Sequence, residues 1–99
     1  MNISKAELST SIGIVLRDLR LAENKSIETL SNEIDIGYSQ LSRIERGKIN
    51  TSIYQLYRIL TVLRIPMDTF LEILKMTIIK QRKSKRRSKR KIRKNEKGK

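Results

Sequence analysis

The sequence predicts an all-α domain of five short helices followed by a basic segment. Between residues 8 and 74, apolar residues recur at intervals of three and four, which is the helical period, and capping or turn residues bound each run. Lysine and arginine dominate the last twenty residues, which contain a single apolar residue and cannot form a core. We therefore expect a folded domain over residues 1–79 and a Lys/Arg-rich, disordered tail over residues 80–99.

The first helix is indicated by apolar residues that step by four and three, so that they share one face: Leu8, Ile12, Leu16 and Leu19. Asn24 follows this run, and asparagine tolerates the left-handed conformation that ends many helices. We expect the helix to end there, with this apolar face turned to the core.

A second helix is expected to begin after Ser26, which can accept a hydrogen bond from the free backbone amides of a helix start. Ile27, Leu30 and Ile34 then lie on one face. Ser31 follows Leu30, at a position where a close crossing of two helices admits only a small side chain. This helix is therefore expected to pack tightly against the next one.

A tight turn and a third helix follow. Asp35 tolerates a left-handed conformation, and Gly37 can serve as the helix cap. Leu41 and Ile44 then face inward, and Gly47 ends the helix. The outward positions carry side chains that can form hydrogen bonds: Tyr38, Ser39, Gln40, Ser42 and Arg43. Two short helices joined by so tight a turn indicate a helix-turn-helix that presents its second helix to DNA.

The fourth helix is expected to begin at Ser52, which is spaced from Gln55 as in a capping box. Its inward face is expected to carry Ile53, Leu56, Leu60 and Leu63. Pro66 disfavours helical geometry in the residue before it and separates a fifth helix. That helix is marked by Met67, Phe70, Leu71 and Leu74.

Residues 39–47, SQLSRIERG, resemble the recognition-helix end of lambda-repressor-like (Cro-type, XRE) DNA-binding domains, and the match extends roughly over residues 12–74. The string, followed by an Ile- and Leu-rich helix, is most similar to the N-terminal domains of Rgg/MutR regulators of Gram-positive bacteria. The resemblance implies a five-helix lambda-repressor-like helix-turn-helix domain. It also implies a recognition helix at about residues 37–46 that enters the major groove of double-stranded DNA.

The functional positions of the family transfer to the residues of this chain that match its motif. Positions that contact base edges are occupied by Tyr38, Ser39 and Arg43. Positions that contact phosphates are occupied by Ser26, Gln40, Ser42, Arg46 and Lys48. The resemblance also implies a structural ion pair between the first and third helices, formed by Arg20 and Glu45.

Three positions depart from the family pattern. Asp35 stands where Gly is usual, and Gly37 stands where Ser or Thr caps the third helix. Both preserve the fold, because Asp can enter the left-handed turn and Gly loses only a few tenths of a kcal/mol against Ser as a cap. Ile27 stands where Gln is usual, and it cannot hydrogen-bond a phosphate. The backbone amides at that helix start remain available for this contact.

The net charge lies almost entirely in the tail. Residues 1–79 hold 10 Lys or Arg and 9 Asp or Glu, whereas residues 80–99 hold 13 Lys or Arg and one Glu. Such a run repels itself and attracts a polyanion. For each duplex phosphate that the tail neutralises, the plot of log K against the logarithm of the salt concentration becomes steeper by about 0.9. We expect the tail to add non-specific phosphate affinity while the third helix selects the sequence.

The composition excludes several function classes. The chain contains no cysteine and no histidine, so it lacks disulfides, thiolate metal sites and the commonest general base. No apolar run approaches the roughly 18 residues of a membrane span, and the N-terminus lacks the apolar core of a secretory signal. We expect a cytoplasmic, non-enzymatic protein with no cofactor, metal, membrane or small-molecule partner. A small single core favours a homodimer, which would read two half-sites about one helical turn apart.

Alternative interpretations stay open at this level. The chain is also compatible with a non-specific nucleic-acid-binding protein, or with a truncated regulator that acts through protein partners. A membrane-surface protein is disfavoured, because the tail has no apolar face to insert. Tyr38 fits either a base contact or an aromatic that shields the turn, and Tyr54 and Tyr57 fit packing or surface positions. A C-terminal apolar stretch either covers the core or forms a dimer seam: Leu71, Leu74, Ile78 and Ile79.

Overall fold

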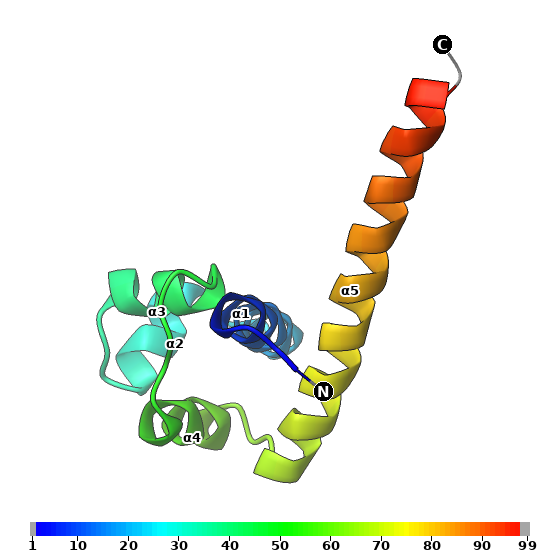
Figure 1. Cartoon of the computed structure of the whole chain (residues 1–99). Helices are drawn as coiled ribbons and strands as arrows, with labels where there is room; N and C mark the ends of the chain where they lie inside the picture. The colour runs from blue at the N-terminus through cyan, green and yellow to red at the C-terminus, as the bar shows by residue number, and fades with distance from the viewer. Residues whose placement is uncertain (1, 98–99) are drawn as a thin grey trace.

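The structure, a computed structural model, describes the backbone of residues 2–97 and the side chains of residues 2–85. Over this range the chain forms five helices, α1 (Lys5–Ala22), α2 (Ile27–Glu33), α3 (Tyr38–Glu45), α4 (Ile53–Val62) and α5 (Met67–Lys97). Helices α1 to α4 form a small body, and α5 runs past α1 and extends beyond it (Figure 1). The predicted all-α, five-helix fold is confirmed. Within the described range, no helix is both long enough and apolar enough to cross a membrane.

Left-handed residues end the helices at the predicted turns. The φ angles are 56° at Asn24, 55° at Asp35 and 71° at Gly47. Arg64 adds another left-handed residue, with φ 60°, which the sequence did not predict because it pointed only to Pro66. Its geometry lets the Ile65 amide donate to the Leu60 carbonyl at 2.9 Å, so α4 closes before the proline is reached.

Serine side chains cap the helix starts. The Ser26 hydroxyl accepts a hydrogen bond from the Thr29 amide at 3.0 Å, as predicted. The Ser52 hydroxyl accepts from the Gln55 amide at 3.0 Å, but the predicted capping box is only half formed. The Gln55 side chain instead accepts from the Arg58 guanidinium at 3.3 Å. Arg58, three residues further along α4, has therefore taken the place of the Ser52 amide as the partner of this side chain.

The buried core joins all five helices. Most inward predictions hold, and the buried apolar residues are Val15, Leu16, Leu30, Ile34, Leu41, Ile44, Leu56, Ile59, Leu60, Leu63, Phe70, Leu74 and Ile78. Of the C-terminal stretch, Leu74 and Ile78 thus cover the core.

Two residues predicted to face inward lie at the surface instead, and so does Leu71, whose place was left open between the core and a dimer seam. Leu8, Ile53 and Leu71 are 37%, 75% and 54% exposed. Leu8 and Ile53 fall early in their helices, before the buried apolar residues begin at Val15 and Leu56. The buried stripe of α5 advances in steps of four from Phe70, so Leu71 lies beside that stripe. Periodicity identified the faces but not where the neighbouring helix covers them.

Two glycines let α1 approach the C-terminal end of α3. A Cβ atom on Gly13 would lie 2.4 Å from the Glu45 carbonyl oxygen and 2.6 Å from that of Ile44. A Cβ atom on Gly47 would lie 2.8 Å from the Cα atom of Thr10. Backbone therefore packs on backbone at both points, which no larger residue permits.

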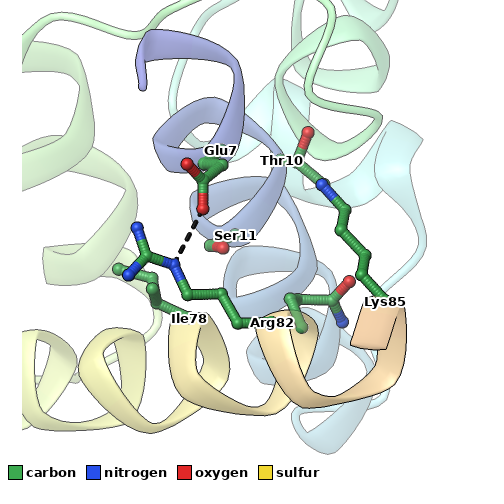
Figure 2. Close-up of a pocket in the computed structure, with 7 residues that line it drawn as sticks. Glu7, Thr10, Ser11, Ile78, Arg82 and Lys85 are labelled. Carbon is green, nitrogen blue, oxygen red and sulfur yellow. Dashed lines mark hydrogen bonds and ion pairs between the residues drawn. The ribbon is translucent and has the colours of Figure 1, made fainter. Parts of the chain in front are cut away.

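Helix α5 continues past residue 80, where the tail was predicted to begin, and an ion pair fastens it to α1. The Arg82 guanidinium Nε donates to Glu7 Oε2 at 2.9 Å, and Figure 2 shows the side chain reaching across from α5. The hydrogen bond from Arg82, followed by that from the Ser4 backbone, lowers the pKa of Glu7 below its ordinary value. Residues 80–97 thus differ from the predicted disordered tail, because they are part of helix α5. The side chains of residues 86–97 and the whole of residues 98–99 lie outside the described part.

We expect Gly13→Ala to destabilise the domain by about 1 to 3 kcal/mol, because the added methyl group must push α1 away from two carbonyl oxygens. This cost outweighs the advantage of about 1 kcal/mol that alanine has over glycine in a helix. Urea denaturation monitored by circular dichroism measures the difference. Gly37→Ser is the control: a Cβ atom there meets nothing within 4 Å, and serine adds a cap, so a slight gain is expected. An unchanged midpoint for Gly13→Ala would contradict the close approach.

Candidate nucleic-acid interface

Helix α3 buries one face and presents the other to solvent. Leu41, Ile44 and Glu45 face inward. On the opposite side, four residues follow the spacing of one helical face, i, i+3, i+4 and i+7: Ser39, Ser42, Arg43 and Arg46. We call these four residues the outward stripe. Ser42 is half-buried and the other three are exposed.

Tyr38 and Gln40 flank the outward stripe at the start of α3. Both side chains are exposed, and that of Tyr38 is 57% exposed, which excludes an aromatic buried under the turn. The α3 N-cap is Gly37, which makes no side-chain cap hydrogen bond. The N-terminal end of α3 is therefore open to a partner.

The turn between α2 and α3 is fixed by hydrogen bonds. Ser31 is buried, its hydroxyl donates to the Glu28 carbonyl at 2.9 Å, and its own carbonyl accepts from the Ile36 amide at 3.0 Å. The Arg58 guanidinium on α4 donates to the Ile34 carbonyl at the end of α2. Arg58 was not among the residues that the sequence singled out, because its partner lies 24 residues away and no local spacing links them.

A buried ion pair joins α1 to α3. Arg20 donates through Nε and Nη2 to the two oxygens of Glu45 at 2.8 and 3.0 Å, and the two residues are only 6% and 8% exposed. The Nη1 atom of Arg20 donates to the Lys25 carbonyl at 2.7 Å, in the loop before α2. One guanidinium therefore holds α1, the start of the helix-turn-helix and the last turn of α3.

The remaining residues named from the sequence lie at the edges of this surface. The Ser26 hydroxyl is occupied, because it accepts from the Thr29 amide and donates to the Thr29 hydroxyl at 3.0 Å. Ile27 is half-buried, and its side chain offers no polar group where the family usually has glutamine. Lys48 is exposed just after α3, and its amide donates to the Arg43 carbonyl at 2.9 Å.

The helix-turn-helix family model HTH_3 matches residues 16–70, which span the ion pair, the turn and the outward stripe. The chain belongs to this helix-turn-helix family. The family comprises XRE/Cro-type transcription regulators and is not enzymatic. The lambda-repressor-like fold predicted from residues 39–47 is thus confirmed.

Solved structures of bacterial regulators share the fold. The clp gene regulator ClgR from Corynebacterium glutamicum is 20% identical with a TM-score of 0.78, and the match covers 83% of this chain and 87% of that one. The restriction-modification controller protein C.Esp1396I is 27% identical with a TM-score of 0.69, covering 74% and 95%. The controller C.AhdI from Aeromonas hydrophila is 31% identical with a TM-score of 0.59, covering 62% and 92%. No functionally curated protein sequence matches the chain.

A further structure of C.Esp1396I shows that protein as a tetramer in complex with its natural 35 base-pair operator. It is 26% identical to this chain with a TM-score of 0.68, and the match covers 73% of this chain and 95% of that one. These neighbours are controller proteins and a clp gene regulator, and they do not single out the Rgg/MutR group.

We expect Glu45→Leu to destabilise the domain by about 3 to 5 kcal/mol, because it leaves the Arg20 guanidinium buried without its carboxylate. The double variant Arg20→Met/Glu45→Leu should recover most of that loss, since it removes both charges and keeps the volume. Chemical denaturation of the two single variants and the double variant completes a double-mutant cycle. Additive losses in this cycle would argue against a buried pair.

Proposed function

We propose that the chain is a sequence-specific, double-stranded DNA-binding transcriptional regulator that places α3 in the major groove. The observation that carries the proposal is the outward stripe, a polar and cationic face on a helix whose other face is locked into the core. A groove-reading helix needs this combination of hydrogen-bonding side chains and a rigid mount. Operator binding by C.Esp1396I, which shares the fold, supports the same role here.

Base recognition is assigned to Tyr38, Ser39 and Arg43. The Arg43 guanidinium can donate two hydrogen bonds to the O6 and N7 atoms of guanine, which is the commonest specific contact in the major groove. Ser39 lies one helical turn before Arg43 on the outward stripe and can pair with either kind of base edge. The exposed Tyr38 ring is available to a thymine methyl group. Arg43 is therefore the residue on which sequence preference chiefly depends.

Phosphate contacts are assigned to two members of that stripe, Ser42 and Arg46, and to three residues around it, Ser26, Gln40 and Lys48. The occupied hydroxyl of Ser26 favours a contact made there by backbone amides of the loop or the helix start. These contacts fix the register of α3 on the duplex and carry no sequence information of their own.

We further propose a homodimer that reads two half-sites about one helical turn apart. Met76 exposes its apolar side chain at 65% exposure, and Ile73 and Ile79, about one turn before and after it on α5, are half-buried, which suits a seam between two copies. We also propose that the protein acts in the cytoplasm. The similarity of SQLSRIERG to Rgg/MutR regulators supports a place in that narrower group.

A second candidate function is non-specific nucleic-acid binding driven by the basic C-terminal residues. It is favoured by the 13 Lys or Arg among residues 80–99. The two functions differ in one measurable respect: only the first predicts enrichment of one inverted repeat from a random duplex library. We favour the first, because non-specific binding through charge alone does not require α3 to be held so rigidly against the core.

We expect Arg43→Ala to cost about 1 to 3 kcal/mol of binding free energy on the selected operator and far less on random duplex DNA. Fluorescence anisotropy with both duplexes measures the two losses. Arg64→Asn serves as the control, because it removes one exposed positive charge at the turn between α4 and α5, and asparagine accepts the left-handed backbone there. Equal losses on the operator and on random DNA would refute base recognition by Arg43.

We expect deletion of residues 86–99 to weaken binding to all duplexes and to leave the selected sequence unchanged. These residues hold nine Lys or Arg and one Glu, and Arg82 is retained on the helix. If about half of the nine engage phosphates, the slope of log K against log salt falls by about four. Selection from a random library with the full and shortened chains compares the preferred sequences. A changed consensus would contradict this division of roles.

A further inference from the structure

A shallow depression of about 430 Å³ lies where α1, α2 and α3 meet. The residues that line it are Arg17, Arg20, Ile27, Ser42, Glu45 and Arg46. Arg20 and Glu45 pair with each other and are buried, so the charges of that pair are matched. The exposed polar groups of the depression are the guanidinium groups of Arg17 and Arg46 and the half-exposed Ser42 hydroxyl.

Both exposed guanidinium groups carry unmatched charge. Neither Arg17 nor Arg46 forms an ion pair with any residue among 2–85. Arg46 donates from Nε to the Ser42 carbonyl at 3.4 Å, which turns its side chain back along the last turn of α3. Its terminal nitrogens make no hydrogen bond within the same residues, so they remain free to donate. Two such arginines on one depression suit an anion with several acceptor oxygens.

The depression is continuous with the outward stripe of α3. Ser42 and Arg46 belong to both, and Ser42 is adjacent in sequence to Arg43, the residue assigned to base recognition. An anion seated in the depression therefore lies directly beside the base-reading side chains. A backbone phosphate of the bound duplex meets this requirement, because phosphates line both edges of the groove that α3 enters.

We propose that Arg17 is a phosphate-contacting residue, and that Arg17, Ser42 and Arg46 form a single site for one DNA backbone phosphate. The proposal rests on the function proposed above and adds a contact from α1, a helix to which no DNA contact had been assigned. Arg17 lies one turn before Arg20 on α1, and Arg20 is fixed to α3 through Glu45. The phosphate thus binds across two helices that the ion pair already holds at a set angle, so the contact fixes the tilt of α3 in the groove.

The test compares DNA binding by the full-length Arg17→Gln variant with binding by the unsubstituted chain, on the operator that the unsubstituted chain selects. Phosphate-ethylation interference reads out individual phosphates, and anisotropy titrations at several salt concentrations give the affinity and the salt slope. We expect about a tenfold loss of affinity, since a hydrogen bond to a charged group is lost. We also expect a salt slope smaller by about 0.9 per bound chain and loss of interference at one phosphate per half-site. The selected base sequence should not change.

Arg64→Asn is again the matched control, because it removes one exposed positive charge in the turn between α4 and α5. Figure 1 shows that turn at the bottom of the molecule, away from α3. Arg17 is exposed, so the variant should fold, and circular dichroism checks this directly. If Arg17→Gln keeps every interference position and matches the control in affinity, the assignment of Arg17 is wrong while the proposed function stands. If the full chain itself enriches no sequence, the proposed function fails and this site fails with it.

Discussion

The orientation of α3 depends on how closely α1 approaches its last turn. One stripe of α1, with spacings of three, four and three, faces this contact, and its members are Thr10, Gly13, Arg17 and Arg20. Thr10 meets the backbone of Gly47, and Gly13 meets the carbonyl groups of Ile44 and Glu45. Arg20 then holds the Glu45 carboxylate. Close steric packing at one end of the stripe and a buried ion pair at the other together fix the position of α3 relative to α1.

That arrangement explains why so much chemistry gathers at the end of a helix of eight residues. A short helix has little stability of its own, and most of its order comes from tertiary packing. Here the packing also neutralises the one acidic residue on the inner face of α3, Glu45, so its negative charge is matched before any polyanion approaches. The outer face can then be cationic without an opposing charge nearby. Structural and binding roles are thus divided between the two faces of the same helix.

The sequence predicted local features well and long-range ones poorly. Caps and turns such as Ser26, Asn24 and Asp35 follow from properties of single residues, and the inward face of α3 follows from its period. Arg20 and Glu45 were paired only through family resemblance, because their spacing of 25 residues has no local signature. Gly13 was overlooked, since a helical glycine signals nothing until its neighbour is known. Ser39 and Arg43 of the outward stripe were predicted correctly as exposed, whereas Ser42 is half-buried. Arg17 was recognised only from the depression that it lines, although its three-residue spacing from Arg20 was a usable signal.

The carboxylate of Glu7 serves two elements at once. Its Oε1 atom accepts from the Ser4 amide at 3.3 Å and completes the capping box of α1, while Oε2 accepts from Arg82 on α5. Fraying of the first turn of α1 and detachment of α5 therefore both break a hydrogen bond of the Glu7 carboxylate, and each event lowers the free-energy cost of the other. Amide exchange in the first turn of α1 and in the neighbouring turns of α5 should behave as one cooperative unit, although the two segments lie 75 residues apart.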